Sequence, residues 1–188
     1  MANLILRLRA MTQTATGDYL LGSVSYWTDE HLQDVLDQYR TDMERCLLRS
    51  EPEYVDGASV YYDYYTPPGS GNFEELGSGV EAWAVRDGNG ALIATADYTI
   101  NYLNGHIRFD TNQAGQARYL RARFFDLNRA AADVWRQKAA HVALRYDIQT
   151  DNHRLTRSQM RAACLEMATY YDRQAGPTHG QLVRSDLY

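Results

Sequence analysis

The residues that could do chemistry in this chain are few, and their spacing matches no catalytic motif. Residues 69–71 and 77–79 each have the sequence Gly-Ser-Gly, which suits a phosphate-binding loop. Such a loop needs a helix after it and, for nucleotides, a lysine next to a serine or threonine. The single lysine is Lys138, and strand-forming residues follow both segments. We therefore expect no phosphate site and no catalytic residue at either segment.

Histidine and aspartate residues offer one candidate site for a metal ion. The chain has five histidines, none in the paired spacing of a zinc site: His31, His106, His141, His153 and His179. Asp147, Asp151 and His153 are close in sequence, but they lie between two predicted helices, where polar residues cap helix ends and face solvent. An enzyme whose site forms around these three residues stays open as one hypothesis. The favoured prediction is a protein without enzymatic activity, metal or cofactor.

The chain is rich in tyrosine, with 15 residues, and four of them are close together: Tyr61, Tyr62, Tyr64 and Tyr65. A tyrosine ring packs on apolar surface while its hydroxyl keeps a hydrogen bond, which suits half-buried binding surfaces. Both faces of the predicted strand carry tyrosine, and both cannot be deep core. Two interpretations stay open: the four rings bind a partner, or they simply belong to a small sheet.

Arginine almost replaces lysine in this chain, since Lys138 is the only lysine among the 19 basic residues. Arginine is enriched and lysine depleted at protein interfaces, because the planar guanidinium makes forked contacts. Genomic base composition explains the bias equally well. Arg121 and Arg123 lie on one side of a predicted strand, so they are either solvated or paired with an acidic surface of a neighbouring subunit. We treat both as candidate partner-binding residues.

Hydrophobic periodicity predicts where the helices lie. Thr28 is a good N-cap, and Trp27 before it can pack over Leu32. Near the C-terminus one apolar stripe is predicted from Met160, Cys164, Met167 and Tyr171. Together, such patterns predict helices at about residues 2–11, 28–48, 127–146 and 156–175.

The middle of the chain changes character. Residues 54–125 are rich in strand formers and turn signals, so we expect antiparallel strands there. The predicted fold class is α+β: an antiparallel helical bundle with an antiparallel β-rich insertion. The predicted division is a helical body of residues 1–50 and 126–176, a β-rich insertion at 51–125 and an extended tail at 177–188.

The sharpest local prediction is a hairpin at residues 104–105, Asn-Gly. This dipeptide supplies the two positive φ angles of a type I′ turn. A two-residue turn pairs Tyr102 with Ile107 and Ile100 with Phe109. These four residues then share one face of the hairpin, and the burial pattern agrees with the turn chemistry.

Composition and charge exclude several classes of protein. The chain has 188 residues, 45% of them apolar, which suffices for one domain with a real core. No apolar run approaches the roughly 20 residues of a membrane span, and no secretory signal is present. The net charge of −5 argues against broad binding of nucleic-acid phosphates. Cys46 and Cys164 fit small buried residues in a reducing compartment, so we expect a soluble intracellular protein.

Three segments resemble one family of viral proteins. Residues 102–109 read Tyr-Leu-Asn-Gly-His-Ile-Arg-Phe, residues 126–135 contain Asp-Leu-Asn and Ala-Ala-Ala-Asp-Val-Trp, and residues 151–159 contain Asp-Asn-His-Arg-Leu and Ser-Gln. In this order and spacing they resemble the head–tail connector (adaptor) proteins of tailed bacteriophages. The helix expected from Thr28 is similar to the first core helix of that family. The resemblance covers residues 28–48 and 97–175.

The resemblance implies a structural virion protein without an active site. Such a protomer is a helical bundle that forms a ring, expected to be about twelve-fold, between the portal and the tail. The ring extends the DNA channel, does not bind DNA sequence-specifically, and docks the next neck or tail protein. The implied partners are therefore further copies of the chain, the portal and a downstream neck or tail protein, with no membrane. Assembly would take place in the host cytoplasm, and the mature protein would lie in the virion neck.

The resemblance also implies a role for the end of the chain. In this family the C-terminal tail often reaches toward the portal, and here that tail includes Arg184, Leu187 and Tyr188. Residues 54–96 exceed a minimal adaptor, so the resemblance assigns them no role. The alternative function is a carbohydrate- or peptide-binding module that uses the tyrosine-rich β unit.

Overall fold

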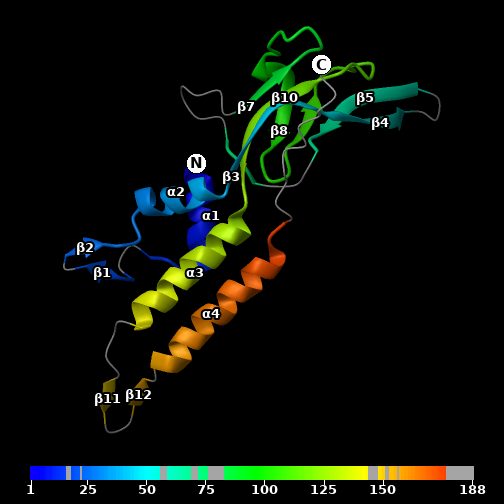
Figure 1. Ribbon diagram of the computed structural model, residues 1–188. Helices are drawn as coiled ribbons and strands as arrows, with labels where there is room; N and C mark the ends of the chain where they lie inside the picture. The colour runs from blue at the N-terminus through cyan, green and yellow to red at the C-terminus, as the bar shows by residue number, and fades with distance from the viewer. Residues whose placement is uncertain are drawn as a thin grey trace, which may run out of the picture.

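The structure, a computed structural model, combines helices with antiparallel sheets (Figure 1). It describes residues 1–15, 18–21, 23–55, 59–68, 72–75, 83–143, 148–150, 153–155 and 157–176. Within these ranges the four α-helices are α1 (Ala2–Thr12), α2 (Asp29–Gln38), α3 (Leu127–Ala143) and α4 (Arg157–Gln174), and η1 (Thr95–Asp97) is a short 3-10 helix. The predicted α+β class is confirmed, and three of the four predicted helices have nearly the predicted bounds.

A helical core forms where α1, α2 and the first half of α3 meet. Thr28 caps α2 as predicted, because its hydroxyl accepts a hydrogen bond from the His31 N–H at 3.2 Å. Trp27, just before the cap, is buried in the same core as Leu32. The buried residues of this core are Leu4, Ile5, Leu8, Trp27, Leu32, Val35, Leu36, Phe125, Leu127, Ala130, Ala131 and Val134.

The helix predicted over residues 28–48 is wrong in its second half. α2 ends at Gln38, and strand β3 (Arg40–Leu47) follows. Tyr39 and Met43 fit a helical stripe, and no glycine or proline in the segment marks a change of structure, so the sequence favours a continuous helix. Pairing with β10 (Tyr119–Phe125) decides in favour of a strand, because tertiary context overrides weak local preference. The β-rich part therefore begins at Arg40, earlier than predicted.

Two four-stranded antiparallel sheets make up the β-rich part. In the first, β10 is central and pairs with β3 and with the two strands β6 (Asn72–Phe73) and β7 (Trp83–Arg86). The strand order of the second sheet is β4 (Arg49–Val55), β5 (Ser59–Thr66), β9 (His106–Phe109) and β8 (Tyr98–Asn101). Two small hairpins complete the strands: β1 (Leu20–Leu21) with β2 (Val24–Ser25), and β11 (Ile148–Thr150) with β12 (His153–Leu155).

A second apolar core lies between these sheets. Leu48, which joins β3 to β4, contributes to it as the chain passes from one sheet to the other. Both sheets supply its remaining buried residues: Tyr65, Phe73, Trp83, Val85, Tyr98, Ile107, Phe109, Leu120 and Ala122.

The predicted hairpin exists, but its register differs by two residues from the prediction. Ile107 pairs with Ile100 rather than with Tyr102, and Phe109 pairs with Tyr98. Side chains alternate with a period of two, so this shift keeps the same residues on the buried face. The predicted face is therefore confirmed, although the predicted pairs are wrong.

The loop of this hairpin is longer than two residues because the Gly105 N–H hydrogen-bonds to a residue four positions earlier. Its N–H donates to the Asn101 carbonyl at 2.7 Å, which closes a wider turn. Gly105 has φ +75°, and a Cβ atom there would come within 2.4 Å of the Phe73 ring. Asn104 accepts a hydrogen bond from the His106 N–H at 3.0 Å and is not among the residues with positive φ. A type I′ turn needs two such residues, and only Gly105 provides one.

Strand β3 carries a bulge. Leu120 of β10 pairs with Cys46, and Ala122 pairs with Met43, so β3 has an extra residue between the two pairs. Arg45 absorbs it with φ +49°, in the left-handed region. A non-glycine residue in this region costs about 1–2 kcal/mol, which the surrounding strand pairing must offset.

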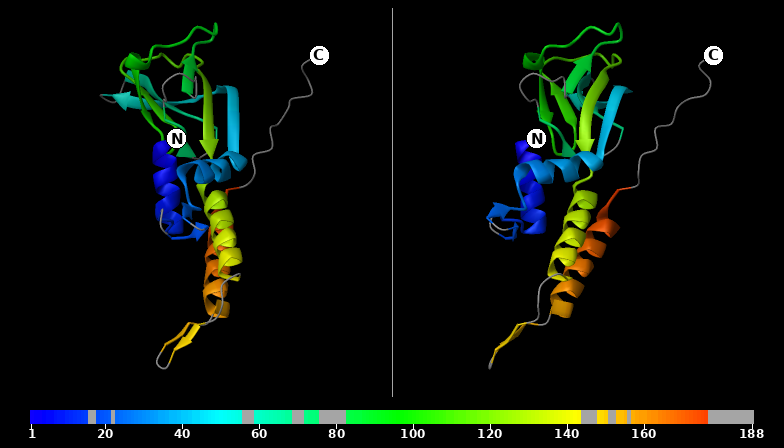
Figure 2. Two further views of the ribbon diagram at one scale, coloured as in Figure 1. Left: turned by 90° about the vertical axis from the view of Figure 1, so that its left-hand side faces the viewer. Right: turned by 60° about the vertical axis from the view of Figure 1, so that its left-hand side comes forward.

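The molecule is elongated (Figures 1 and 2). The sheets lie at one end, and α1, α2 and the start of α3 lie in the middle. From there α3 and α4 run side by side to the β11–β12 hairpin at the other end. In the described part of the chain, no helix is both long enough and apolar enough to cross a membrane.

Candidate assembly interface

Helix α3 is the element that joins the two ends of the molecule. Asp126 Oδ1 caps it by accepting hydrogen bonds from the N–H groups of Asn128 and Arg129, both at 3.1 Å. Asp126 and Asn128 are both residue types that favour an N-cap, and the structure places Asp126 at the cap. The Asp126 N–H also donates to the Tyr39 carbonyl at 3.1 Å, so the end of α2 and the start of α3 meet.

Three consecutive alanines let neighbouring elements approach α3 closely, as their small size predicts. Ala130, Ala131 and Ala132 are all fully buried. Both α1 and α2 pack against α3. Since protein interiors are close-packed, a larger side chain at these positions would displace a neighbouring helix.

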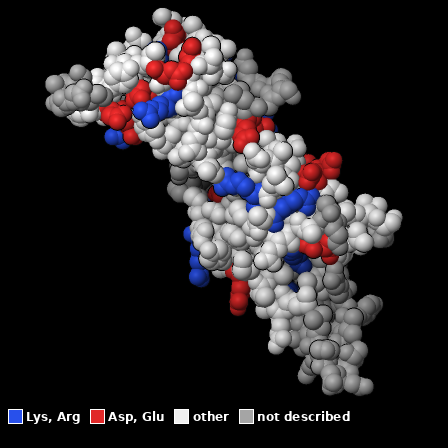
Figure 3. Space-filling model, turned by 180° about the vertical axis from the view of Figure 1, so that it is seen from behind, with Lys and Arg blue, Asp and Glu red and all other residues white. Residues whose placement is uncertain are grey.

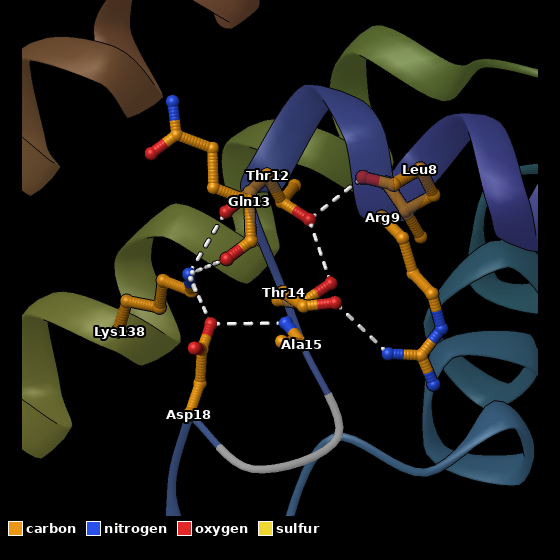
Figure 4. Close-up of polar contacts among 8 residues, drawn as sticks. All are labelled: Leu8, Arg9, Thr12, Gln13, Thr14, Ala15, Asp18 and Lys138. Atoms are coloured by element: carbon orange, nitrogen blue, oxygen red, sulfur yellow. Dashed lines mark hydrogen bonds and ion pairs between the residues drawn. The ribbon is translucent and has the colours of Figure 1, made fainter.

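Lys138 of α3 holds the end of α1 (Figure 4). Its Nζ donates to the carbonyls of Thr12 at 2.8 Å and Gln13 at 2.9 Å, and it lies 3.5 Å from Asp18 Oδ2. Burial lowers the pKa of Lys138, and the nearby Asp18 carboxylate acts in the opposite direction. The last carbonyls of a helix have no partner within the helix. The single lysine of the chain thus satisfies these groups and has a structural role.

Helix α4 packs along one side of α3. Among the α4 side chains that the structure describes, only Ala168 is buried. The Tyr171 hydroxyl donates to the Met11 carbonyl at 3.0 Å, and Arg136 of α3 forms an ion pair with Asp172. These contacts hold α4 against α3 and the end of α1.

The opposite side of α4, here called the α4 outer face, includes four small or apolar residues: Ala162, Ala163, Leu165 and Tyr170. At about 100° per residue these four lie on the arc turned away from the stripe that faces α3, and they share it with the polar residues Gln159, Glu166, Thr169 and Arg173. Leu165 is 41% exposed and Tyr170 is 51% exposed, and both alanines are exposed. A helix with apolar residues on more than one side usually has more than one neighbour. The α4 outer face is therefore our candidate assembly interface.

The sequence pattern did not indicate the α4 outer face. Apolar spacing predicted a single stripe on the last helix, and Leu165 and Tyr170 fall outside that stripe. The positions of Leu165 and Tyr170 outside the stripe could have indicated a second surface, because a helix that packs against one neighbour needs apolar residues on only one side.

The four tyrosines considered as a binding patch have different surroundings on β5. Tyr65 is fully buried in the sheet core, and burial raises its pKa. The Tyr64 hydroxyl bonds to His106, whereas Tyr62 is half-buried and Tyr61 is exposed. The ring of Tyr65 is thus unavailable to a partner. Partner contacts of the other three stay a prediction.

Arg121 and Arg123 form ion pairs within the chain. Arg121 Nε lies 3.0 Å from Glu44 Oε1. Arg123 lies 3.6 Å from Asp42 and 3.7 Å from Glu74. Glu44 and Asp42 belong to β3, the segment predicted as helix, so the sequence could not suggest this pairing. Both arginines are partly exposed, and their contact with a partner stays a prediction.

The remaining candidate residues lie mostly outside the described residues. These are Arg184, Leu187 and Tyr188 of the C-terminal tail, together with Asp147 and Asp151 of the candidate metal site. Within the described ranges, no three His, Cys, Asp or Glu side chains are grouped so that they could hold a metal ion.

Charges on the face shown in Figure 3 are mixed. Acidic and basic side chains lie next to one another in small groups separated by uncharged surface. Proteins that bind nucleic acid through its phosphates present a basic patch or stripe. Such a stripe is not visible in the described part of this face.

Comparison of the chain with models of protein families, with curated proteins and with solved structures gave no match in any of the three. The candidate interface therefore rests on the geometry of α3 and α4 and on the side chains that α4 exposes.

Proposed function

We propose that this protein is a head–tail connector of a tailed bacteriophage: a structural protein, not an enzyme, that forms a ring between the portal and the tail. The observation that carries the proposal is the α4 outer face. It presents Leu165 and Tyr170 to solvent beside two exposed alanines. Apolar side chains gain free energy when buried, and the small alanine side chains near Leu165 let a neighbouring element come close.

In the proposed ring, the α4 outer face of one copy packs against a different surface of the next copy. Such a head-to-tail contact closes into a ring when its rotation is suitable. The helices then form a bundle-like body, and residues 40–125 form a β-rich insertion. The sheets and the β11–β12 hairpin lie at opposite ends of the elongated chain, which supports docking of two partners, the portal and the next neck or tail protein.

The proposed ring surrounds the DNA channel in the virion neck, after assembly in the host cytoplasm. DNA must slide through such a channel, so its wall should bind phosphates weakly. The net charge of −5 and the mixed charges in Figure 3 support this property.

Light scattering on the purified protein, alone and mixed with the portal protein of the same phage, tests the proposal. We expect a closed oligomer of about twelve chains, either alone or only with portal. A chain that stays monomeric in both samples would contradict the proposal.

Two variants locate the contact. Leu165→Asp combined with Tyr170→Asp should reduce the oligomer, because an unpaired charge inside an apolar contact is costly. The matched control is Leu92→Asp, since Leu92 is 60% exposed and follows β7 at the sheet end of the molecule. An oligomer unaffected by the double substitution would place the interface elsewhere. Circular dichroism of each monomer checks that the variants fold.

A further inference from the structure

A hollow beside the bulge of β3 combines several charged side chains. Its volume is about 290 Å³, at the small end of the range for ligand sites. A hollow of this size fits one side chain better than a large ligand. Residues of β3, β7, β10 and the turn after β7 line it, among them Glu44, Arg45, Arg86, Asp87, Tyr119 and Arg121.

Arg45 is the unusual residue of this hollow. Its φ of +49° lies in the region that favours glycine, yet the position holds one of the largest side chains. The Arg45 guanidinium lies 5.1 Å from the centre of the Tyr119 ring. No hydrogen bond or ion pair to this guanidinium occurs among the described residues. Strained backbone often accompanies a functional side chain, and bulges can re-aim one. Glycine would suit this backbone conformation better, so the arginine side chain itself explains why this position holds an arginine.

The other charged groups of the hollow have partners. Arg121 Nε lies 3.0 Å from Glu44 Oε1, and Arg86 donates to a backbone carbonyl of the turn at 3.0 Å. Asp87 Oδ1 accepts hydrogen bonds from two backbone N–H groups, at 2.9 Å and 2.8 Å. Three arginines thus face two carboxylates in the hollow, and Arg45 supplies the excess positive charge.

We propose that this hollow binds a carboxylate side chain from an acidic segment of a partner protein, with Arg45 as the main contact. A guanidinium stacked on an aromatic ring still presents its N–H donors at its edge, where a carboxylate accepts them in pairs. The two carboxylates in the wall and the net charge of −5 disfavour a dense polyanion such as nucleic acid. This binding does not depend on ring formation.

Fluorescence anisotropy with a labelled peptide of alternating glutamate and serine tests the proposal. We expect saturable binding that Arg45→Gly weakens about tenfold, through loss of a charge-assisted hydrogen bond. Glycine suits a positive φ, so this variant should fold at least as well as the unsubstituted protein. Urea unfolding of the variant verifies this, so that lost binding cannot be attributed to lost structure.

Three comparisons keep the test specific. Arg49→Ala removes an exposed arginine of β4 that does not line the hollow, and it should leave binding unchanged. Arg45→Lys keeps the charge without the forked donors, so its affinity should be intermediate. The same peptide with glutamine in place of glutamate should not bind.

Four results would overturn the proposal: no saturable binding, equal binding of the glutamine peptide, equal binding by Arg45→Gly, or saturable binding of labelled oligothymidylate in place of the glutamate peptide. The last result would assign the hollow to nucleic acid.

Discussion

Helices α3 and α4 have nearly the same length, 17 and 18 residues, but very different surroundings. α3 is enclosed by α1, α2 and α4, whereas α4 packs mainly on α3 and exposes its outer face. Apolar content alone does not explain the difference, because α4, although it is the less apolar helix, keeps Leu165 and Tyr170 in solvent. The comparison shows that the number of packed neighbouring helices determines which helix is part of the core. α3 contributes to the core, and the α4 outer face stays exposed to solvent.

Matched leucine substitutions should give the largest contrast between the two helices. Leu127 of α3 is 2% exposed, so Leu127→Ala should lower the free energy of unfolding by about 2–5 kcal/mol. Leu165 of α4 is 41% exposed, so Leu165→Ala should change it by at most about 0.5 kcal/mol in the monomer. Urea unfolding followed by circular dichroism measures both. Equal losses would mean that α4 is as deeply packed as α3, contrary to the comparison.

Two tyrosines extend the contrast between buried and exposed side chains to alkaline pH. Burial, followed by the effect of Tyr102, raises the pKa of Tyr98 in β8 to about 12. An unfolded tyrosine has a pKa of about 10, so the stabilisation is complete below that pH and is lost as the pH rises toward 12, by about 2–3 kcal/mol in total. Tyr98→Phe should remove most of this loss. Urea unfolding over a series of alkaline pH values measures it.

Tyr171 of α4 is the matched control for Tyr98. Burial raises its pKa as well, but the residue is only half-buried. Tyr171→Phe should therefore leave most of the alkaline loss in place. If Tyr171→Phe removed the loss and Tyr98→Phe did not, the idea that the more deeply buried tyrosine controls alkaline stability would be refuted.

The start of α3 should be sensitive to its cap. Asp126→Ala removes the acceptor of two N–H groups and should lower the free energy of unfolding by about 0.5–2 kcal/mol. Asp126→Asn keeps a capping oxygen and should retain most of the stability. Thermal unfolding of both variants measures the difference. Were the asparagine variant as unstable as the alanine variant, the charge of Asp126, and not its cap, would be responsible.

The ion pair between the two helices should have the smallest effect. Arg136 and Asp172 have side chains that are 46% and 42% exposed, so solvent screens their interaction. A double-mutant cycle with Arg136→Ala and Asp172→Ala should give a coupling energy below about 1 kcal/mol. A coupling of several kcal/mol would show that α4 depends on this pair rather than on its apolar stripe.

Much of the local structure was predictable, because its causes lie within a few residues. Thr28 caps α2 through its own hydroxyl, and the helices α1, α3 and α4 follow from apolar spacing that is visible in the sequence. The buried face of the β8–β9 hairpin was predictable for the same reason, since alternation survives a register shift of two residues.

The candidate sites were predictable only in part. The abundance of tyrosine and arginine suggested binding surfaces, but Tyr65 lies in the core and Arg121 pairs with Glu44. That pair requires β3 to be a strand, which the sequence near Tyr39 does not indicate. The backbone of Arg45 was equally hidden, because the bulge exists only through pairing with β10.

By itself, then, the sequence determined the Thr28 cap, the turn glycine, the period of each apolar face and the acidic balance of −5, all of which depend on near neighbours or on composition. Only the tertiary structure decided that residues 40–47 form a strand, which tyrosine is buried, which charges pair and which side of α4 stays open. These features depend on which distant segment lies alongside, and the free energy of strand pairing and burial depends on that neighbour.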